Sequence, residues 1–317
     1  MTKPKNFAPM AFGLIIGLGL TASAMAKDCI GVISAGAGYA FWNSVEAGAK
    51  KAGHELGYTI YFRGPRDERN VNAQKYIIDI ISKLNCKGLV IAPNAPVIAE
   101  DVALLKEKGI PTVYIDRDIG GADVLNVVAT DNFNAGKLAA REMAKALKGN
   151  GNVALLGLKN GIPSTDARET GFVKEATKLG LKIVISEYVG TTIGDVRTNS
   201  ERVLKGSTTH IDGIFTPNET TSIGTSVVLR ELDMTSKVVH IGFDSGDYLY
   251  KALADGRIYG LVIQRPFEMG YQGVYIVHRK IHGEGANSGN VTIDTGVIFA
   301  TKSNMNEPEV SKILRMN

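Results

Sequence analysis

The chain has 317 residues, which is long enough for two α/β domains that each bury a hydrophobic core. Hydrophobic residues make up 44% of it and charged residues 21%, a balance that excludes a disordered chain or a coiled coil. The formal net charge of +4 is small for this length and gives no support for binding to nucleic acid.

The first 26 residues have the pattern of a secretory signal peptide. Lys3 and Lys5 precede an uncharged stretch that ends in an Ala-Met-Ala triplet, so a basic start, an apolar middle and a small-residue cleavage site follow one another. An uncleaved membrane anchor is the alternative, but the glycines of the middle segment and the adjacent cleavage site favour cleavage after about Ala26. We therefore expect an exported mature chain that starts near Lys27, carries a net charge of about +2 and is not inserted in the membrane.

From residue 29 onward, short runs rich in β-branched residues alternate with longer amphipathic segments, and glycines follow the helices. The first half predicts strands at 30–34, 58–62, 88–92, 111–115 and 124–130, and helices at 42–56, 71–84, 96–108 and from residue 132 onward. The second half predicts strands at 152–157, 182–188, 213–216, 238–242, 259–263 and 297–300, and helices near 168–179, 195–204, 220–232, 248–254 and 267–282. This alternation predicts an α/β fold of two doubly wound parallel-sheet lobes with a ligand cleft between them.

Two cysteines, Cys29 and Cys86, each lie just before an apolar predicted strand. If those strands are neighbours in a parallel sheet, their amino ends are close, and an exported protein lies in a compartment that permits a disulfide. A disulfide across a loop of that length would contribute roughly 4 kcal/mol. Two buried free thiols are the alternative, and the spacing does not fit a metal site, so no metal is expected.

The loop after the first strand, Gly36-Ala-Gly-Tyr-Ala-Phe41, invites comparison with a dinucleotide-binding loop. It departs from that fingerprint because Phe41 stands at the third glycine position and Arg63, not an acid, ends the second strand. The loop instead supplies three aromatic residues, Tyr39, Phe41 and Trp42. These residues either pack in the core or form an aromatic wall for the apolar face of a sugar.

Charged and amide side chains lie at the carboxyl ends of several predicted strands. Asp116-Arg117 follows the strand at 111–115 and is either a surface ion pair or a paired acceptor and donor that faces the cleft. The residues placed in the same way in the second half are Arg168, Asn218, Asp244 and Gln264. This mixture of donors and acceptors suits a neutral polyol, whose hydroxyl groups both donate and accept.

The sequence gives little support for catalysis. Its five histidines fall in predicted helices or before strands, away from the cleft, and it contains neither a G-x-S-x-G elbow nor a P-loop. We therefore expect a binding protein without a cofactor and not an enzyme.

Several of these fragments, in this order and spacing, make the chain resemble the ribose-binding-protein-like periplasmic sugar-binding proteins, which are related to the effector-binding core of lactose-repressor-type regulators. The similarity covers nearly all of the mature chain. It rests on Phe41-Trp42, Ile110-Pro111 with Asp116-Arg117, Thr130-Asp131-Asn132 with Ala135-Gly136, Ala167-Arg168-Glu169 with Gly171-Phe172, Phe215 to Asn218, Gly242-Phe243-Asp244, and Gln264.

The resemblance implies a bilobal protein that closes like a hinge on one monosaccharide, a pentose or a hexose, and delivers it to the membrane permease of an ABC importer. Phe41 and Trp42 would stack on or border the sugar ring, and Phe243 would line the pocket from the second lobe. The residues that would bond the hydroxyl groups are Asp116, Arg117, Arg168, Asn218, Asp244 and Gln264. The chain would act as a monomer and bind no nucleic acid.

The resemblance also implies three crossings between the lobes, near residues 130–131, 264–265 and 294–297. The expected N-terminal lobe comprises mainly residues 27–130 and about 295–317, and the C-terminal lobe comprises about 131–264. Residues 265–296 are split between the lobes at the hinge, with 265–294 near it.

The chain departs from the family pattern at three places. Gly38-Tyr39 replaces a pair of asparagines, which makes Tyr39 a further candidate for ligand binding, and Thr191 stands where a second-lobe aromatic is expected. Asn218 is followed by Glu219-Thr220 instead of Asp-Glu.

Other functions of the same cleft remain open from sequence. The protein could present a sugar or polyol to a chemoreceptor or sensor kinase in place of a permease. A repressor is disfavoured, because a signal peptide stands where a helix-turn-helix would be needed.

Overall fold

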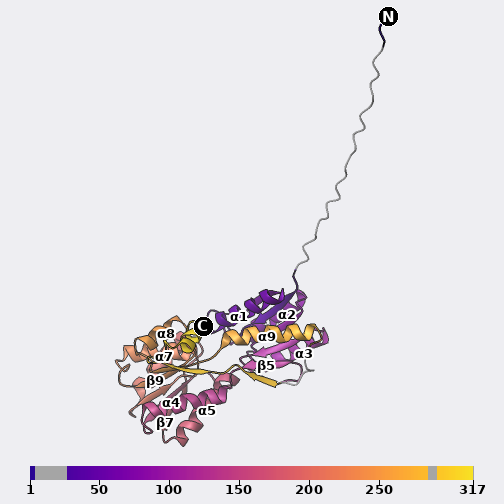
Figure 1. Ribbon diagram of the computed structural model, residues 1–317. Helices are drawn as coiled ribbons and strands as arrows, with labels where there is room; N and C mark the ends of the chain where they lie inside the picture. The colour runs from indigo at the N-terminus through magenta and orange to yellow at the C-terminus, as the bar shows by residue number, and fades with distance from the viewer. Residues whose placement is uncertain (4–26, 285–290, 317) are drawn as a thin grey trace.

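A computed structural model of the chain describes residues 1–3, 27–284 and 291–316. All but the first three residues of the predicted signal peptide, and most of the Gly/Asn-rich loop at 283–290, lie outside the described residues. In the described ranges no helix is both long and apolar enough to cross a membrane. The described chain forms two lobes, each built on its own six-stranded sheet (Figure 1).

The sheet of the N-terminal lobe has the strand order β11-β5-β4-β3-β1-β2, and all of its strands are parallel. These strands are β1 (Cys29–Ile33), β2 (Thr59–Arg63), β3 (Gly88–Ile91), β4 (Thr112–Ile115), β5 (Asn126–Ala129) and β11 (Val291–Asp294). Helices α1 (Ala40–Leu56) and α9 (Pro266–Ile281) cover one face, and α2 (Val71–Lys83) and α3 (Ile98–Glu107) cover the other. The central strands are apolar and β-branched because both of their faces are buried.

The sheet of the C-terminal lobe has the equivalent order β12-β10-β9-β8-β6-β7. Its strands are β6 (Asn152–Gly157), β7 (Lys182–Tyr188), β8 (Gly213–Phe215), β9 (Val239–Phe243), β10 (Gly260–Ile263) and β12 (Ile298–Thr301). Helices α4 (Asn132–Ala146) and α5 (Pro163–Lys178) pack on one face. The other face is covered by α6 (Ile193–Gly206), α7 (Glu219–Glu231), α8 (Asp247–Ala254) and α10 (Pro308–Met316). The two-lobe α/β prediction is therefore confirmed.

Glycines allow close helix packing in the same way in both lobes. A Cβ on Gly136 of α4 would lie 1.9 Å from the carbonyl oxygen of Arg168 in α5, and one on Gly171 of α5 would lie 2.1 Å from that of Phe133. In the N-terminal lobe, a Cβ on Gly48 of α1 would lie 2.0 Å from the carbonyl oxygen of Phe267 in α9, and one on Gly270 of α9 would lie 2.1 Å from that of Val45 in α1. These glycines therefore let each helix pair approach until the backbones are in contact, as the adjacent α1 and α9 in Figure 1 illustrate.

The chain passes between the lobes three times, at the predicted places. It crosses between β5 and α4 at residues 130–131, between β10 and α9 at 264–265, and between β11 and β12 at 295–297. The crossings bring the carboxyl ends of the strands of both sheets to the space between the lobes.

The predicted assignment of residues 295–317 to the N-terminal lobe is wrong. Strand β12 pairs antiparallel with β10 in the C-terminal sheet, and α10 joins the hydrophobic cluster of α8 through Val310, Ile313 and Leu314. Residues 265–294, which were expected near the hinge, supply α9 and β11 to the N-terminal lobe. The physical reason is that β11 has only four residues and is largely exposed, so its short Val-Thr-Ile-Asp alternation gives too weak a signal to predict a strand there.

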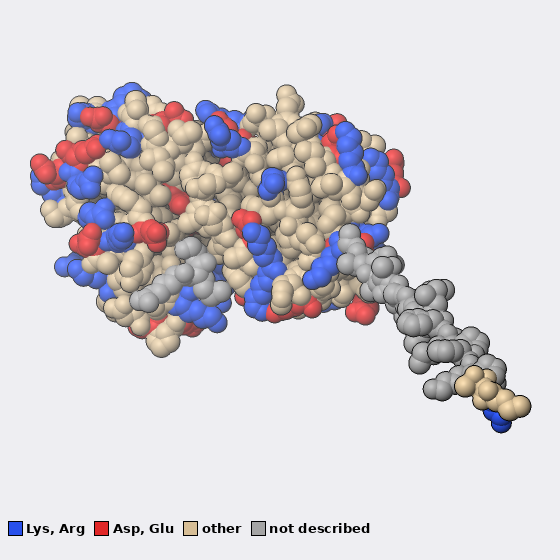
Figure 2. Space-filling model, turned by 90° about the horizontal axis from the view of Figure 1, so that it is seen from above, with Lys and Arg blue, Asp and Glu red and all other residues tan. Residues whose placement is uncertain are grey.

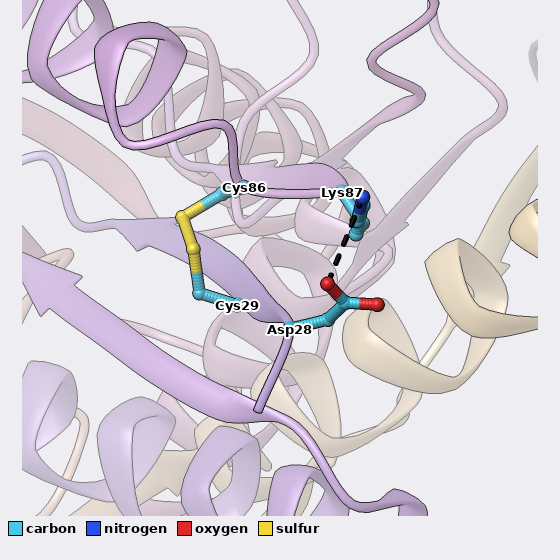
Figure 3. The surroundings of a disulfide bond; sticks show 4 residues. All are labelled: Asp28, Cys29, Cys86 and Lys87. Carbon is cyan, nitrogen blue, oxygen red and sulfur yellow. Dashed lines mark ion pairs between the residues drawn. A yellow bond between two sulfur atoms is a disulfide. The ribbon is translucent and has the colours of Figure 1, made fainter. Parts of the chain in front are cut away.

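Cys29 and Cys86 form the predicted disulfide, so the alternative of two free thiols is wrong (Figure 3). Strands β1 and β3 are hydrogen-bonded neighbours, with Ile30 opposite Gly88, and this places the two Cα atoms 4.6 Å apart. Beside the disulfide, Lys87 pairs with Asp28 at 3.6 Å. The bond therefore joins the amino ends of two adjacent strands, far from the cleft.

Candidate functional site

A cavity of about 390 Å³ lies between the lobes, at the carboxyl ends of the strands. Nine of the ten predicted ligand-binding residues line it: Tyr39, Phe41, Trp42, Asp116, Arg117, Arg168, Asn218, Asp244 and Gln264. Residues that are more than 200 positions apart in the sequence therefore meet at one cavity.

The tenth predicted residue, Phe243, is not among the residues that line the cavity. Phe243 ends β9, and its side chain is fully buried in the core of the C-terminal lobe. The guanidinium of Arg168 lies over its ring, 4.0 Å from the centroid. The structure thus places Phe243 beneath Arg168 and not at the cavity wall.

The aromatic wall of the cavity comes from the N-terminal lobe. Gly38, with a φ of 84°, turns the chain after β1, and Phe41 and Trp42 then lie in the first turn of α1. Their rings meet edge to face with centroids 4.7 Å apart, and both belong to the hydrophobic core under α1 and α9. These rings therefore pack in the core and also line the cavity, and their contact with a sugar stays a prediction.

On the same lobe, Asp116 and Arg117 follow β4 and are buried, so they are not a surface ion pair. Arg117 donates from Nε to Oδ2 of Asp116 at 3.1 Å and from Nη2 to Oε2 of Glu68 at 2.6 Å. Burial raises the pKa of Asp116, and the charges of Arg117 and Arg168 oppose that rise. Burial lowers the pKa of Arg117, but the negative charges of Glu68 and Asp116 have the larger effect, so the pKa is raised.

The C-terminal lobe contributes Arg168 from α5. Its Nε donates to Oδ1 of Asn132 at 2.8 Å, and its Nη1 donates to the carbonyl oxygen of Pro217 at 2.9 Å. Its Nη2 is buried without a hydrogen-bond acceptor among the described residues and lies 3.9 Å from Oδ1 of Asp116 in the other lobe. Burial lowers the pKa of Arg168, against the charges of Asp244 and Asp116. Arg168 therefore holds one donor free at the junction of the lobes.

Asp244 takes the place in the C-terminal lobe that Asp116 takes in the N-terminal lobe. Each follows the third strand from the crossing edge of its sheet, and each has a left-handed backbone, with φ of 62° at Asp116 and 71° at Asp244. Asp244 accepts from Nε2 of Gln264 at 2.6 Å and from the backbone N–H of Glu219 at 2.8 Å. Burial raises its pKa, opposed by Arg168. Each lobe thus presents one buried aspartate at the cavity.

The remaining predicted residues lie at the loops and crossings. Asn218 is the N-cap of α7, and its side chain accepts from the backbone N–H of Thr221. Gln264 lies at the second crossing, where the hydroxyl of Thr130 donates to its Oε1 at 2.9 Å. Burial raises the pKa of Tyr39, against a hydrogen bond with Thr220.

Sequence reasoning missed six lining residues: Glu68, Leu158, Ser164, Thr165, Glu219 and Thr220. Ser164 and Thr165 belong to the first turn of α5, which begins five residues before the predicted start. Glu68 lies in a charged loop whose composition is typical of an exposed turn, so no local signal marked it. Thr191, where the family has an aromatic, lies instead in a neighbouring cavity of about 620 Å³ that shares only Glu68 and Arg117 with the first.

The arrangement can donate to and accept from several hydroxyl groups at once, between an aromatic wall and four carboxylates. Across the described ranges, no group of three or more His, Cys, Asp or Glu side chains could hold a metal ion. On the face shown in Figure 2, Lys and Arg are interspersed with Asp and Glu over both lobes, in line with the small net charge.

Residues 30–285 match the family model described as the periplasmic binding protein domain, and the chain belongs to this family. Among curated relatives, the ribose import binding protein of Haemophilus influenzae is 27% identical over 299 residues, which cover 93% of this chain and 99% of that protein. A solved periplasmic component of an ABC-type sugar transport system from Hahella chejuensis is 35% identical, with a TM-score of 0.81 over 86% of this chain and 99% of that one. A solute-binding protein of an ABC transporter from Agrobacterium vitis, solved with bound D-fucose, is 29% identical, with a TM-score of 0.84 over 90% and 99% of the two chains.

Proposed function

We propose that the protein captures a monosaccharide, a pentose or a hexose, in the cavity between its lobes and delivers it to the permease of an ABC importer. The observation that carries this proposal is the convergence of nine predicted binding residues from both lobes on one cavity of about 390 Å³. The relatives support it, because the Haemophilus protein is named for ribose import and the Agrobacterium protein holds D-fucose.

Each part of the cavity has a role that follows from its chemistry. Phe41, Trp42 and Tyr39 border the apolar face of the sugar ring. Asp116 and Asp244 accept from hydroxyl groups, and Arg117 and Arg168 donate to hydroxyl oxygens. The amides of Asn218 and Gln264 can do both, as hydroxyl recognition requires.

The three crossings at 130–131, 264–265 and 295–297 serve as the hinge about which the lobes close. Closure removes water from the cavity, and the hydrogen bonds to the sugar then contribute more than they would in solvent. The protein acts as a monomer in the periplasm, after cleavage of its signal peptide near Ala26, and releases the sugar chemically unchanged.

Isothermal titration calorimetry against pentoses, hexoses and polyols tests this function. D-Ribose, D-allose, D-xylose, D-arabinose, D-fucose and D-tagatose form the sugar panel, with xylitol and sorbitol as polyols. We expect one or more of the sugars to bind with a stoichiometry of one, and to raise the melting temperature because it binds only the folded state. Absence of binding by every sugar would overturn the proposal.

The site assignment is tested by three single substitutions, Asp116→Ala, Arg168→Ala and Asp244→Ala. Each is expected to weaken binding of the tightest panel sugar by more than about 1 kcal/mol, because each leaves a buried partner unsatisfied. Asp79→Ala is the matched control, since Asp79 pairs with Lys83 on the exposed face of α2. Unchanged affinity in all three variants would remove this site.

A further inference from the structure

Helix α1, which carries Phe41 and Trp42, begins without a cap from its own N-cap residue. That residue, Tyr39, has an extended backbone and makes no capping hydrogen bond through its side chain. The first N–H groups of a helix need acceptors from outside the helix. In α2, α4 and α6 these come from the local side chains of Asn70, Asp131 and Thr192.

The acceptor for α1 comes from the other lobe. Oε1 of Glu219, the first residue of α7, accepts from the backbone N–H of Ala40 at 3.3 Å, and Oε2 accepts from that of Phe41 at 3.2 Å. A carboxylate at this position also interacts favourably with the helix dipole. Glu219 is 7% exposed, so these bonds are made away from water.

The surroundings of Glu219 show that the lobes are in direct contact at this point. A Cβ on Gly246, which has a φ of 145°, would lie 3.0 Å from the Cβ of Ala40 in the opposite lobe and 3.5 Å from Oε1 of Glu219. The backbone N–H of Glu219 donates to Asp244, which ties the start of α7 to the binding site. Burial and the charge of Asp244 raise the pKa of Glu219 to about 7, opposed by the two backbone N–H groups.

We propose that Glu219 is a positioning residue that couples closure of the lobes to the aromatic wall of the sugar site. Its two bonds join different lobes and exist only when the lobes meet. Closure thereby completes the cap of α1 and fixes the first turn, in which Phe41 and Trp42 lie. The inference rests on the proposed function for the identity of the ligand, whereas the contact between Glu219 and the start of α1 does not depend on it.

Hydrogen exchange tests the contact directly. We compare wild type, Glu219→Ala and the matched control Thr192→Val, which removes the acceptor that caps α6 within its own lobe. Loss of the cap in Glu219→Ala is expected to speed exchange of the amides of residues 40–42 severalfold, although the substitution is in the other lobe. Thr192→Val should speed exchange only at the start of α6.

Affinity for the panel sugars distinguishes positioning from direct contact. Glu219→Ala should weaken binding of each sugar by about the same factor, close to tenfold, because a cap contributes to closure and not to the recognition of one hydroxyl. Glu219→Gln keeps one acceptor oxygen and should fall between wild type and Glu219→Ala.

Two results would overturn the inference. One is equal exchange at residues 40–42 in wild type and Glu219→Ala, without sugar and with each panel sugar at saturation. The other is an affinity loss that reorders the sugars while exchange at these amides is unchanged. Failure of every sugar to bind wild type would instead overturn the proposed function, and exchange in the sugar-free protein would still decide the role of Glu219.

Discussion

The ion pair between Asp116 and Arg168 joins the two lobes across the cavity, and a double-mutant cycle can measure its contribution. Nη2 of Arg168 lies 3.9 Å from Oδ1 of Asp116, and the side chains are 2% and 6% exposed. Asp116→Asn and Arg168→Met, made singly and together, remove the charges with little change in volume. Because the partners belong to different lobes, we expect the coupling to appear in the free energy of sugar binding.

The distance sets the size of the effect. Two unit charges about 4 Å apart attract by about 4 kcal/mol at the effective dielectric constant of a protein site. The cost of burying the two charges offsets part of this attraction, as the raised pKa of Asp116 and the lowered pKa of Arg168 indicate. We therefore expect a net coupling of about 1–2 kcal/mol.

Calorimetric titration of the four proteins with the tightest panel sugar gives the coupling energy. The same cycle on Asp79 and Lys83, an exposed pair within α2, is the control and should show no coupling in binding. If the two cleft substitutions were additive to within about 0.3 kcal/mol, the pair would not act across the closed cleft and the electrostatic reasoning would be refuted.

Three further predictions concern stability. Replacing Cys29 and Cys86 by serine should lower the free energy of unfolding in urea by roughly 4 kcal/mol, because the disulfide closes a loop of 57 residues. An unchanged free energy of unfolding in the doubly substituted protein would contradict this. Burial raises the pKa of Glu169 to about 7 from 4.5, so its stabilising contribution is complete below about pH 4.5 and is lost as the pH rises through 7. Relative to Glu169→Gln, the wild type should therefore lose up to about 3 kcal/mol between pH 5 and pH 8, and parallel urea-stability profiles of the two proteins would exclude this assignment. Gly136→Ala should destabilise the protein by about 1–3 kcal/mol, because its Cβ would meet the backbone of α5 at 1.9 Å, whereas Gly206→Ala, with open space around it, should be neutral or stabilising. Equal melting temperatures of the two variants would show that α4 and α5 can separate at no cost.

Much of the fold could be predicted from the sequence because the central strands are short apolar runs between glycine-terminated helices. Strands β6 and β7 were predicted with their observed bounds, at 152–157 and 182–188. Prediction failed at the end of the chain, where β11 is only four residues long and largely exposed and β12 runs antiparallel. Which lobe such a strand joins depends on pairing between distant residues, and local sequence does not specify that.

The residues of the candidate site also fall into those that the sequence could predict and those that it could not. Residues that directly follow a strand, such as Asp116 and Asp244, could be predicted because parallel strands end at one edge of the sheet. Glu68 and Glu219 could not be predicted, because each is positioned by a partner that is distant in sequence. Glu68 pairs with Arg117 at 2.6 Å, and Glu219 accepts from the first turn of α1. Phe243 was misplaced because a residue at a strand end can face either the core or the cleft, and alternation alone did not decide which.

The position of Asp116 and Asp244 explains why closure and recognition should occur together. Each lobe holds one buried carboxylate at the equivalent strand end, turned by a left-handed residue, and Arg168 approaches both. The N-terminal lobe has the aromatic wall but lacks Arg168, whereas the described residues of the C-terminal lobe supply Arg168 and the amides of Asn218 and Gln264 but no aromatic residue at the cavity. Neither lobe alone can therefore surround a sugar with both a stacking surface and a full set of hydroxyl partners. We therefore expect selectivity among stereoisomers to be set in the closed form, by donors of Arg168 whose directions Asn132 and Pro217 fix within the C-terminal lobe before any sugar arrives.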